Sequence, residues 1–279
     1  MKIGFIGQGF IGKNYADDFE KRGFDVVRYS MEEPYVQNKE KIIECDIVFI
    51  AVPTPTTPDG FDDTIVRKVI KLVGKGKVAV VKSTVLPGSI EEIEKDNPEI
   101  FVLNSPEFLR EATAAYDAAN PERNIIGIPK ETPEYREKAE MVMKVLAKSS
   151  YELICTSKEA EIIKYAGNCF LFTKVIFMNI LHDLTTKTGG KWDVVADALV
   201  HDSRVGESHM QPVHDSGRGA GGHCFIKDFA AFTNLYENLV GDMEGKAVLR
   251  AMEAKNIELL VGTGKNLDLL KGVYGERIK

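Results

Sequence analysis

Residues 2–12, KIGFIGQGFIG, combine a short apolar run with a glycine-rich turn and the start of a helical pattern. Residues 2–6 are typical of a β-strand, and residues 11–22 have helical periodicity. Between them, residues 7–12 match Gly-x-Gly-x-x-Gly, which allows a tight turn, close approach of a pyrophosphate and close helix–strand packing. This context predicts a dinucleotide site formed by Gly7, Gln8, Gly9, Phe10, Ile11 and Gly12.

The rest of the chain divides into two patterns. Up to about residue 157, apolar strand-like runs alternate with helical segments, which favours a parallel, doubly wound sheet. From residue 158 onward the pattern is mostly helical. We therefore predict an α/β fold with an N-terminal Rossmann-type, NAD(P)-binding domain (1–157), and a smaller all-helical substrate and dimerisation domain (158–279) joined to it by a long helix.

Composition and charge exclude several classes of function and partner. The chain of 279 residues has a formal net charge of −6 and no block of Lys or Arg, so neither nucleic acid nor a membrane is an expected partner. The apolar stretch 166–181 is too polar to cross a bilayer and predicts a buried helix. The start of the chain is too short for a signal peptide, and the four cysteines are widely spaced. We expect a cytoplasmic protein with reduced thiols and no metal.

The second strand ends Arg28-Tyr29-Ser30, where an acidic residue would ordinarily hold the ribose of NAD. Ser30 can still bond a ribose, Arg28 could favour a 2′-phosphate, and Glu32 and Glu33 could compensate. NAD is the expected cofactor, and NADP is not excluded.

Residues 219–228, GAGGHCFIKD, are the most informative stretch of the second half. The glycines allow backbone amides to converge on an anion, and a cysteine after them, followed by a lysine, is placed where a thiolate is stabilised. We predict Cys224 as the nucleophile and Cys45, Cys155 and Cys169 as core thiols. His209, His214 and His223 fit no standard zinc spacing.

Further candidates follow other strands and the long helix. Residues 104–111 carry two carboxylates able to act as a base and a clamp, and the hydroxyls of 52–56 and 83–87 are expected to point into the same crevice. Lys164 and Asn168 share one face of a helix. They could bond a substrate and a water, or the lysine could simply reach solvent.

Taken together, these motifs resemble the UDP-glucose/GDP-mannose dehydrogenase family, through AVPTPTTPDG at 51, KSTVLPG at 82, NSPEFLREAT at 104, DSRVG at 202 and GRGAGGHCFIKD at 217. The resemblance implies two successive hydride transfers, with Cys224 forming a thiohemiacetal and then a thioester. It implies that Lys164 stabilises oxyanions, that Asn168 and Asp228 position an oxygen and a water, and that Glu107 and Thr84 serve thioester hydrolysis.

The resemblance also implies the ligand contacts and a homodimer through the long helix. Cofactor contacts fall on Ser30, Val52, Pro53, Thr54, Ser83, Thr84, Glu111 and Lys227. Substrate contacts fall on Glu107, Phe108, Leu109, Lys164, Asn168, Arg218, Gly219, Gly221 and, across the dimer interface, Arg204. An apolar helix face with Phe170, Val175, Phe177 and Met178 agrees with a dimer and equally with packing inside the chain.

This sequence departs from the family at Ser30, at Ile226, where a proline is common, and at its end, which predicts a shortened member without the third, nucleotide-binding domain. The leading function is NAD(P)-dependent oxidation of the C6 alcohol of a UDP-glucose-like nucleotide sugar to the uronate. The alternatives are a two-electron dehydrogenase of the β-hydroxyacid type and a non-catalytic dinucleotide- or sugar-nucleotide-binding protein.

Overall fold

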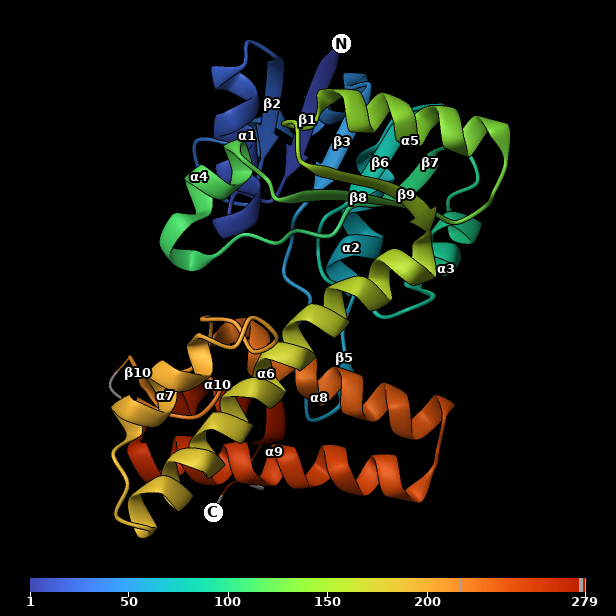
Figure 1. The fold of residues 1–279 in the computed structure, drawn as a ribbon. Coiled ribbons are helices and arrows are strands. Elements are labelled where there is room, and N and C mark those ends of the chain that lie inside the picture. Colours follow the sequence, from blue (N-terminus) through green and yellow to red (C-terminus); the bar gives the residue numbers. More distant parts are fainter. Residues whose placement is uncertain (216, 276–277, 279) are drawn as a thin grey trace. The chain divides into compact units, whose positions relative to one another are not determined.

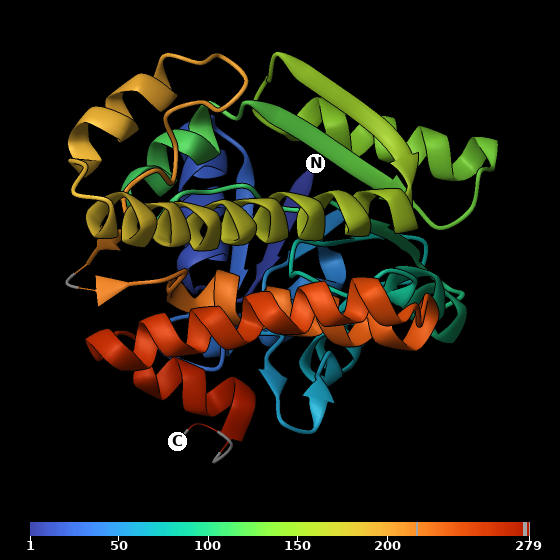
Figure 2. The same ribbon diagram turned by 60° about the horizontal axis from the view of Figure 1, so that its bottom comes forward.

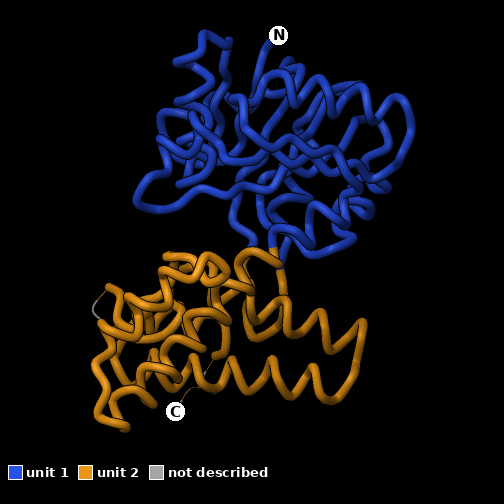
Figure 3. The backbone as a smooth tube through the Cα atoms, viewed as in Figure 1, with its two compact units in different colours: residues 1–54, 62–164 blue, residues 55–61, 165–279 orange. Residues whose placement is uncertain are grey.

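The computed structural model describes residues 1–215, 217–275 and 278, and its chain forms two compact units (Figure 3). Unit 1 comprises residues 1–54 and 62–164, and unit 2 comprises residues 55–61 and 165–279. The chain leaves unit 1 for the last time within helix α6 (Ser157–Lys187), between Lys164 and Tyr165. The predicted domain limits, 1–157 and 158–279, stay a prediction.

Unit 1 is built on a seven-stranded sheet of order β2-β1-β3-β6-β7-β8-β9 (Figure 1). Strand β1 lies between β2 and β3, both of which come later in the chain, so the strand order reverses at β1. Doubly wound sheets bind ligands at such a reversal. The predicted Rossmann-type fold is confirmed. The strands are β1 (Lys2–Ile6), β2 (Asp25–Tyr29), β3 (Ile47–Ile50), β6 (Val78–Val81), β7 (Phe101–Asn104), β8 (Arg123–Ile128) and β9 (Tyr151–Thr156).

One pairing departs from the all-parallel sheet that the sequence predicts. Strands β7 and β8 are antiparallel, with Asn104 opposite Gly127, whereas β9 runs parallel to β8. A parallel return needs a crossover that runs the length of the strand. The connection here holds only η3 (Glu111–Thr113) and α4 (Ala114–Ala119). The six residues of α4 rise only about 9 Å, and α4 packs on α1 (Phe10–Lys21), so the connection does not run back along the sheet.

Strands β3 and β6 are buried along their whole length, because helices cover both faces of the sheet. One face packs against α1, α4 and α5 (Pro133–Val145), where the rings of Phe5, Phe19 and Phe49 lie 5.0–5.3 Å apart. The remaining helices of unit 1 are η1 (Val36–Glu44), α2 (Thr64–Val69), η2 (Ile70–Leu72) and α3 (Ser89–Asp96), of which α3 packs on β7.

Unit 2 is helical, as the sequence predicts. Besides the later part of α6 it contains α7 (Trp192–Val200), α8 (Gly222–Leu239), α9 (Met243–Thr263) and α10 (Leu267–Tyr274). Helices α8, α9 and α10 lie side by side (Figures 1 and 2) around the buried side chains of Ile226, Leu260 and Leu270. Two short ribbons complete the unit. One pairs β10 (Val213–His214) with β11 (Gly217–Arg218), and the other pairs β4 (Thr56–Thr57) with β5 (Gly60–Phe61).

The prediction that 166–181 is a buried helix is wrong for one face of α6. Phe172 is buried and stacks on Phe229 at 3.8 Å between ring centroids. On another side, within the unit 2 part of α6, four large apolar residues are exposed, and we call them the α6 stripe: Phe170, Phe177, Ile180 and Leu184. Along the described part of the chain, no helix is long and apolar enough to cross a membrane.

Candidate functional site

The three glycines of the turn before α1 differ in how much space surrounds them. Gly7 has a φ of +91°, and a Cβ there would collide with the carbonyl oxygen of Ala51. A Cβ at Gly12 would collide with the carbonyl oxygen of Gly7. At Gly9, by contrast, a built Cβ would meet no described atom within 4 Å. Gly7 and Gly12 are therefore needed for the turn and its packing, and Gly9 leaves open space.

That open space lies at the N-terminus of α1, because Gly9 is the N-cap residue of this helix and has no side chain to occupy its amides. The first turn consists of Phe10, Ile11, Gly12 and the basic Lys13. Amide donors, the helix dipole and a nearby cation all favour an anion. These residues fit the pyrophosphate of a dinucleotide.

The ribose end of the predicted cofactor site is acidic. Arg28 is 8% exposed, and its guanidinium bonds Glu20 at 2.7 and 2.8 Å and Asp17 at 2.7 Å. The hydroxyl of Ser30 donates to the carbonyl oxygen of Glu32 and accepts from its amide. The charge of Arg28 is thus already compensated by two carboxylates of α1.

The loops after β3 and β6 are bonded to each other. The Ser83 hydroxyl accepts from the amide of Val52 at 2.9 Å and donates to its carbonyl oxygen at 2.7 Å. The Thr54 hydroxyl donates to the carbonyl oxygen of Thr84 at 2.7 Å. The expectation that these hydroxyls point into an open crevice is wrong for Ser83 and Thr54, which are buried, because main-chain groups of the neighbouring loop are their partners. Thr84 is half-buried and Pro53 exposed.

Glu107 and Lys164 form a buried pair. Their exposed fractions are 4% and 6%, and the Lys164 Nζ lies 2.8 Å from both the Oε1 and the main-chain oxygen of Glu107. The other carboxylate oxygen, Oε2, accepts from the amide of Leu109. The open alternative of a solvent-reaching lysine is therefore wrong, because the ammonium group lies inside unit 1.

Sequence reasoning missed Lys82, which also lies near this pair. It is 3% exposed, its Nζ lies 3.3 and 3.4 Å from the main-chain and hydroxyl oxygens of Ser105, and it lies 4.0 Å from the centre of the Tyr15 ring. Burial lowers the pKa of Lys82 to about 7, which Glu107 opposes and Lys164 reinforces. The available signal was a lysine directly after the apolar strand 78–81.

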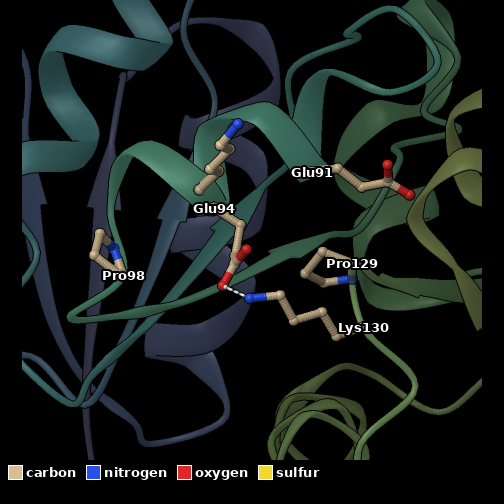
Figure 4. Close-up of a pocket in the computed structure, with 6 residues that line it drawn as sticks. Glu91, Glu94, Pro98, Pro129 and Lys130 are labelled. Carbon is tan, nitrogen blue, oxygen red and sulfur yellow. Dashed lines mark hydrogen bonds and ion pairs between the residues drawn. The ribbon is translucent and has the colours of Figure 1, made fainter.

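Among the pockets that the described residues form, two lie in unit 1 and can be compared with the predicted site. A pocket of about 140 Å³ is lined by Phe108 and Leu109 together with Tyr15, Arg110, Asp117, Asn120, Pro121, Glu122 and Arg123. A pocket of about 450 Å³ lies beside α3, where Lys130 bonds Glu94 at 2.7 Å (Figure 4). None of the predicted site residues lines the larger pocket, so its size does not mark the predicted chemistry. Glu111 is exposed.

In unit 2, the predicted residues gather at the start of α8. Cys224 is the third residue of this helix and is exposed. Asp228, one turn later, is 1% exposed, accepts from the Asn168 Nδ2 at 2.6 Å and pairs with the Lys227 Nζ at 2.5 Å. A helix N-terminus favours the thiolate form of a cysteine.

The other three cysteines, all of them described, differ from Cys224. Cys45 and Cys169 are buried and Cys155 is partly buried. Burial raises the pKa of Cys45 and of Cys155 to about 11, and it also raises that of Cys169. These thiols are therefore poor nucleophiles near neutral pH.

The glycine-rich loop before Cys224 corrects one prediction. The amides of Arg218, Ala220 and Gly222 donate to Thr263, Asn256 and Asn266 rather than converging on an anion. The reason is close packing: a Cβ at Gly219 would lie 2.9 Å from the Asn256 Oδ1, and one at Gly221 would collide with the Asn266 Oδ1.

The two candidate arginines of unit 2 are also paired. Arg218 bonds the side-chain and main-chain oxygens of Asn179 at 2.9 and 3.1 Å and pairs with Asp183 at 2.7 Å. Arg204 has an 87% exposed side chain and pairs with Asp202. Among the described residues, no group of His, Cys, Asp and Glu is arranged to hold a metal ion.

Comparison with known proteins places the chain in a family. The model of the UDP-glucose/GDP-mannose dehydrogenase family, NAD binding domain, matches residues 33–148, and the model of the central domain of the same family matches residues 158–256. The chain belongs to the UDP-glucose/GDP-mannose dehydrogenase family. Glu107 lies within the first match, and Lys164, Asn168, Cys224 and Asp228 lie within the second. An NAD-binding domain in this family supports a nicotinamide dinucleotide as cofactor.

Individual members agree with this placement. UDP-glucose 6-dehydrogenase of Rhizobium meliloti is 31% identical over 85% of this chain and 64% of that protein. The solved UDP-glucose dehydrogenase of Pyrobaculum islandicum is 26% identical, with a TM-score of 0.78 over 94% of this chain and 71% of that one. The 3-hydroxyisobutyrate dehydrogenase of Mycobacterium tuberculosis shares the fold, with a TM-score of 0.73 over 99% of both chains at 14% identity. The chain spans 34% to 64% of the length of the curated relatives it matches.

Proposed function

We propose that this chain oxidises the C6 alcohol of a UDP-glucose-like nucleotide sugar to the uronate, with NAD as oxidant and Cys224 as covalent nucleophile. The observation that carries the proposal is the start of α8, where exposed Cys224 lies one helical turn before the buried carboxylate of Asp228. A thiol in a first helical turn, close in sequence to a lysine–carboxylate pair, meets the conditions for a reactive cysteine. Membership of the family supports the substrate class.

The residues at the turn and at α1 suit the cofactor. Gly7 and Gly12 shape the turn, and Gly9 leaves room for a pyrophosphate at the amides of α1. Bound NAD supplies the acceptor for the hydride that leaves C6 in each of two oxidations. The residues of the chain position the substrate, move protons and hold the carbon skeleton between the two oxidations.

The covalent step falls to Cys224. After the first oxidation, its thiolate adds to the carbon of the aldehyde, which forms a C–S bond and moves the carbonyl electron pair onto oxygen. The Lys164 Nζ stabilises this oxyanion, as a preformed cation does where charge develops. Asn168 and Asp228 position the reacting oxygen and a water, through which the hydroxyl proton leaves.

The second oxidation converts the thiohemiacetal into a thioester, which water must cleave. Glu107 takes a proton from that water, with Thr84 beside it, and the C–S bond breaks to release the carboxylate and the Cys224 thiolate. Overall, one alcohol, two NAD⁺ and one water give one carboxylate, two NADH and three protons, so atoms and electrons balance.

The test is an assay with UDP-glucose and other nucleotide sugars, in which reduced cofactor is followed by absorbance and the acid by mass spectrometry. Two equivalents of reduced cofactor per sugar are expected, and C224A should abolish acid formation. C155A, which alters a partly buried thiol, should keep full activity. Acid production by C224A at the wild-type rate would refute the covalent role.

The same assay separates the alternatives. One equivalent of reduced cofactor from a β-hydroxyacid, unaffected by C224A, would identify a two-electron dehydrogenase. Tight binding of NAD and nucleotide sugars without turnover of any substrate would identify a non-catalytic binding protein.

We also propose that NAD is preferred over NADP. Support comes from Arg28, whose ion pairs with Asp17 and Glu20 leave an acidic environment for a 2′-phosphate. Binding titrations should give a lower Kd for NAD, and the double variant D17N/E20Q should tighten NADP binding. The control D18N removes a neighbouring carboxylate that pairs with Arg22 instead. Tighter binding of NADP than NAD by the wild type would contradict the proposal.

A homodimer through α6 is the third part of the proposal. Phe170, Phe177 and Leu184 of the α6 stripe are spaced by seven residues, a repeat that suits two copies of one helix packing face to face. Val175 and Met178, which we expected on the same face, are instead buried inside unit 2. In sedimentation experiments F177E should yield monomers, whereas L239E, at an exposed residue of α8, should not. A monomeric wild type at micromolar concentration would refute this part.

A further inference from the structure

The loop that precedes Cys224 is held by side chains that follow it by about forty residues. We call Asn256, Lys265 and Asn266 the C-terminal clamp. Asn256 bonds both main-chain groups of Ala220, accepting from its amide at 2.7 Å and donating to its carbonyl oxygen at 3.0 Å. Asn256 is 3% exposed, so neither bond is exchanged easily for water.

Lys265 holds the same loop from its other side. Its Nζ lies 2.7 Å from the carbonyl oxygen of His214 and 3.3 Å from that of Gly219, and the residue is 8% exposed. Burial lowers the pKa of Lys265, and the two carbonyl oxygens solvate its amine in place of water. The main chain on both sides of residue 217 is therefore tied to one ammonium group.

Asn266 acts on the helix itself. Gly221, the N-cap residue of α8, has no side chain to accept a bond from the first turn. The Oδ1 of Asn266 accepts from the amide of Gly222, the first residue of the helix, at 3.0 Å. Asn266 is itself the N-cap residue of α10, with a φ of +52°, and Leu270 of α10 packs against Ile226 of α8.

We propose that Asn266, supported by Asn256 and Lys265, is a positioning residue for Cys224, because it caps α8 from outside the helix and so fixes the turn that carries the thiol. The inference deepens the proposed function, and it rests on that function for the role of Cys224 as a nucleophile. Asn256 is the last residue of the central-domain match, and Lys265 and Asn266 lie beyond it.

The physical consequence is a change in thiol reactivity. When a cap is lost, the first helical turn frays, and the amides and dipole that stabilise an anion there are no longer aligned. Removing the acceptor of Asn266 should therefore slow alkylation of Cys224 near neutral pH by roughly two- to fivefold, the range of helix-terminus effects on a nearby charge.

The test compares N266G with wild type in the full chain. Glycine tolerates a φ of +52° and removes the side chain that carries the acceptor. Iodoacetamide alkylation of Cys224 is followed by peptide mass spectrometry across pH 6 to 9, and hydrogen exchange of residues 217–226 is measured in parallel. The control D242G removes the N-cap acceptor of α9, Asp242, and so has a similar general cost at another helix start.

The expected result is slower alkylation in N266G, a pH–rate profile displaced to higher pH, and faster exchange at 217–226, with D242G like wild type in all three. Wild-type alkylation in N266G, or equal slowing in D242G, would overturn the proposal. Alkylation of the buried Cys45 and Cys169 would reveal that N266G is unfolded. In that case the variant K265M, which keeps Asn266, is tested in place of N266G. The same slower alkylation is expected of it, and wild-type alkylation would again overturn the proposal.

These readouts do not depend on turnover. Slower alkylation in N266G, in a chain that oxidises no nucleotide sugar, would refute the proposed function and leave the positioning role standing. Wild-type alkylation in N266G, in a chain that oxidises UDP-glucose, would refute the positioning role and leave the proposed function standing.

Discussion

Lys82 is an ionisable group buried at a cost, and replacing it by methionine tests that cost. The residue is 3% exposed and its ammonium group lies against the Tyr15 ring and Ser105, so the charged form has lost most of its water. Methionine has a similar length and carries no charge. The K82M variant therefore keeps the packing and removes the proton equilibrium.

The magnitude follows from the pKa of Lys82, which burial lowers from 10.5 to about 7. Between these values the unfolded chain binds a proton that the folded chain does not, so the stability of the wild type rises with pH. The full gap corresponds to about 5 kcal/mol, at about 1.4 kcal/mol per pH unit. Between about pH 7 and about pH 9, wild type should gain about 2 kcal/mol relative to K82M.

Urea unfolding of both proteins at several pH values gives this difference directly, because groups common to both cancel. K148M is the matched control, since the Lys148 side chain is 86% exposed and should give no such trend. A difference between wild type and K82M that stays constant from pH 7 to pH 9 would refute the reasoning, because Lys82 would then keep its charge in the folded state.

Three further predictions concern packing and capping in unit 1. K164M should lower the free energy of unfolding by about 3–5 kcal/mol, because it leaves the Glu107 carboxylate buried and unpaired. In urea unfolding, the double variant K164M/E107Q should recover part of this loss; an equal loss in the single and the double variant would contradict the prediction. G12A should cost about 1–3 kcal/mol and abolish the thermal shift by NAD, because its Cβ meets the Gly7 carbonyl; a normal shift would count against the turn. E161A should cost about 1–2 kcal/mol in the same unfolding assay, because Glu161 accepts from the amides of Gly88 and Ile90 at the start of α3; an unchanged midpoint would exclude this cap.

Much of the fold followed from local patterns. Apolar runs alternating with helical segments indicated the sheet of unit 1, and glycines marked the turn before α1, because burial and backbone torsion are encoded residue by residue. The antiparallel entry of β8 and the docking of 55–61 in unit 2 were not predictable in this way. They depend on where a connection packs, as α4 does on α1, and a local pattern carries no such information.

The site divides along the same line. Sequence alone determined the family, the glycine turn and the candidate thiol, since each depends on residue types at short, fixed spacing. Only the tertiary structure decided which polar groups are already engaged. Arg28 is neutralised by α1, Lys164 is buried against Glu107, and the loop before Cys224 is bonded from residues 256–266. Arg28 and Glu20 are 8 residues apart, Lys164 and Glu107 are 57 apart, and Gly222 and Asn266 are 44 apart. A hydrogen bond or ion pair between them exists only where folding brings both groups within about 3 Å.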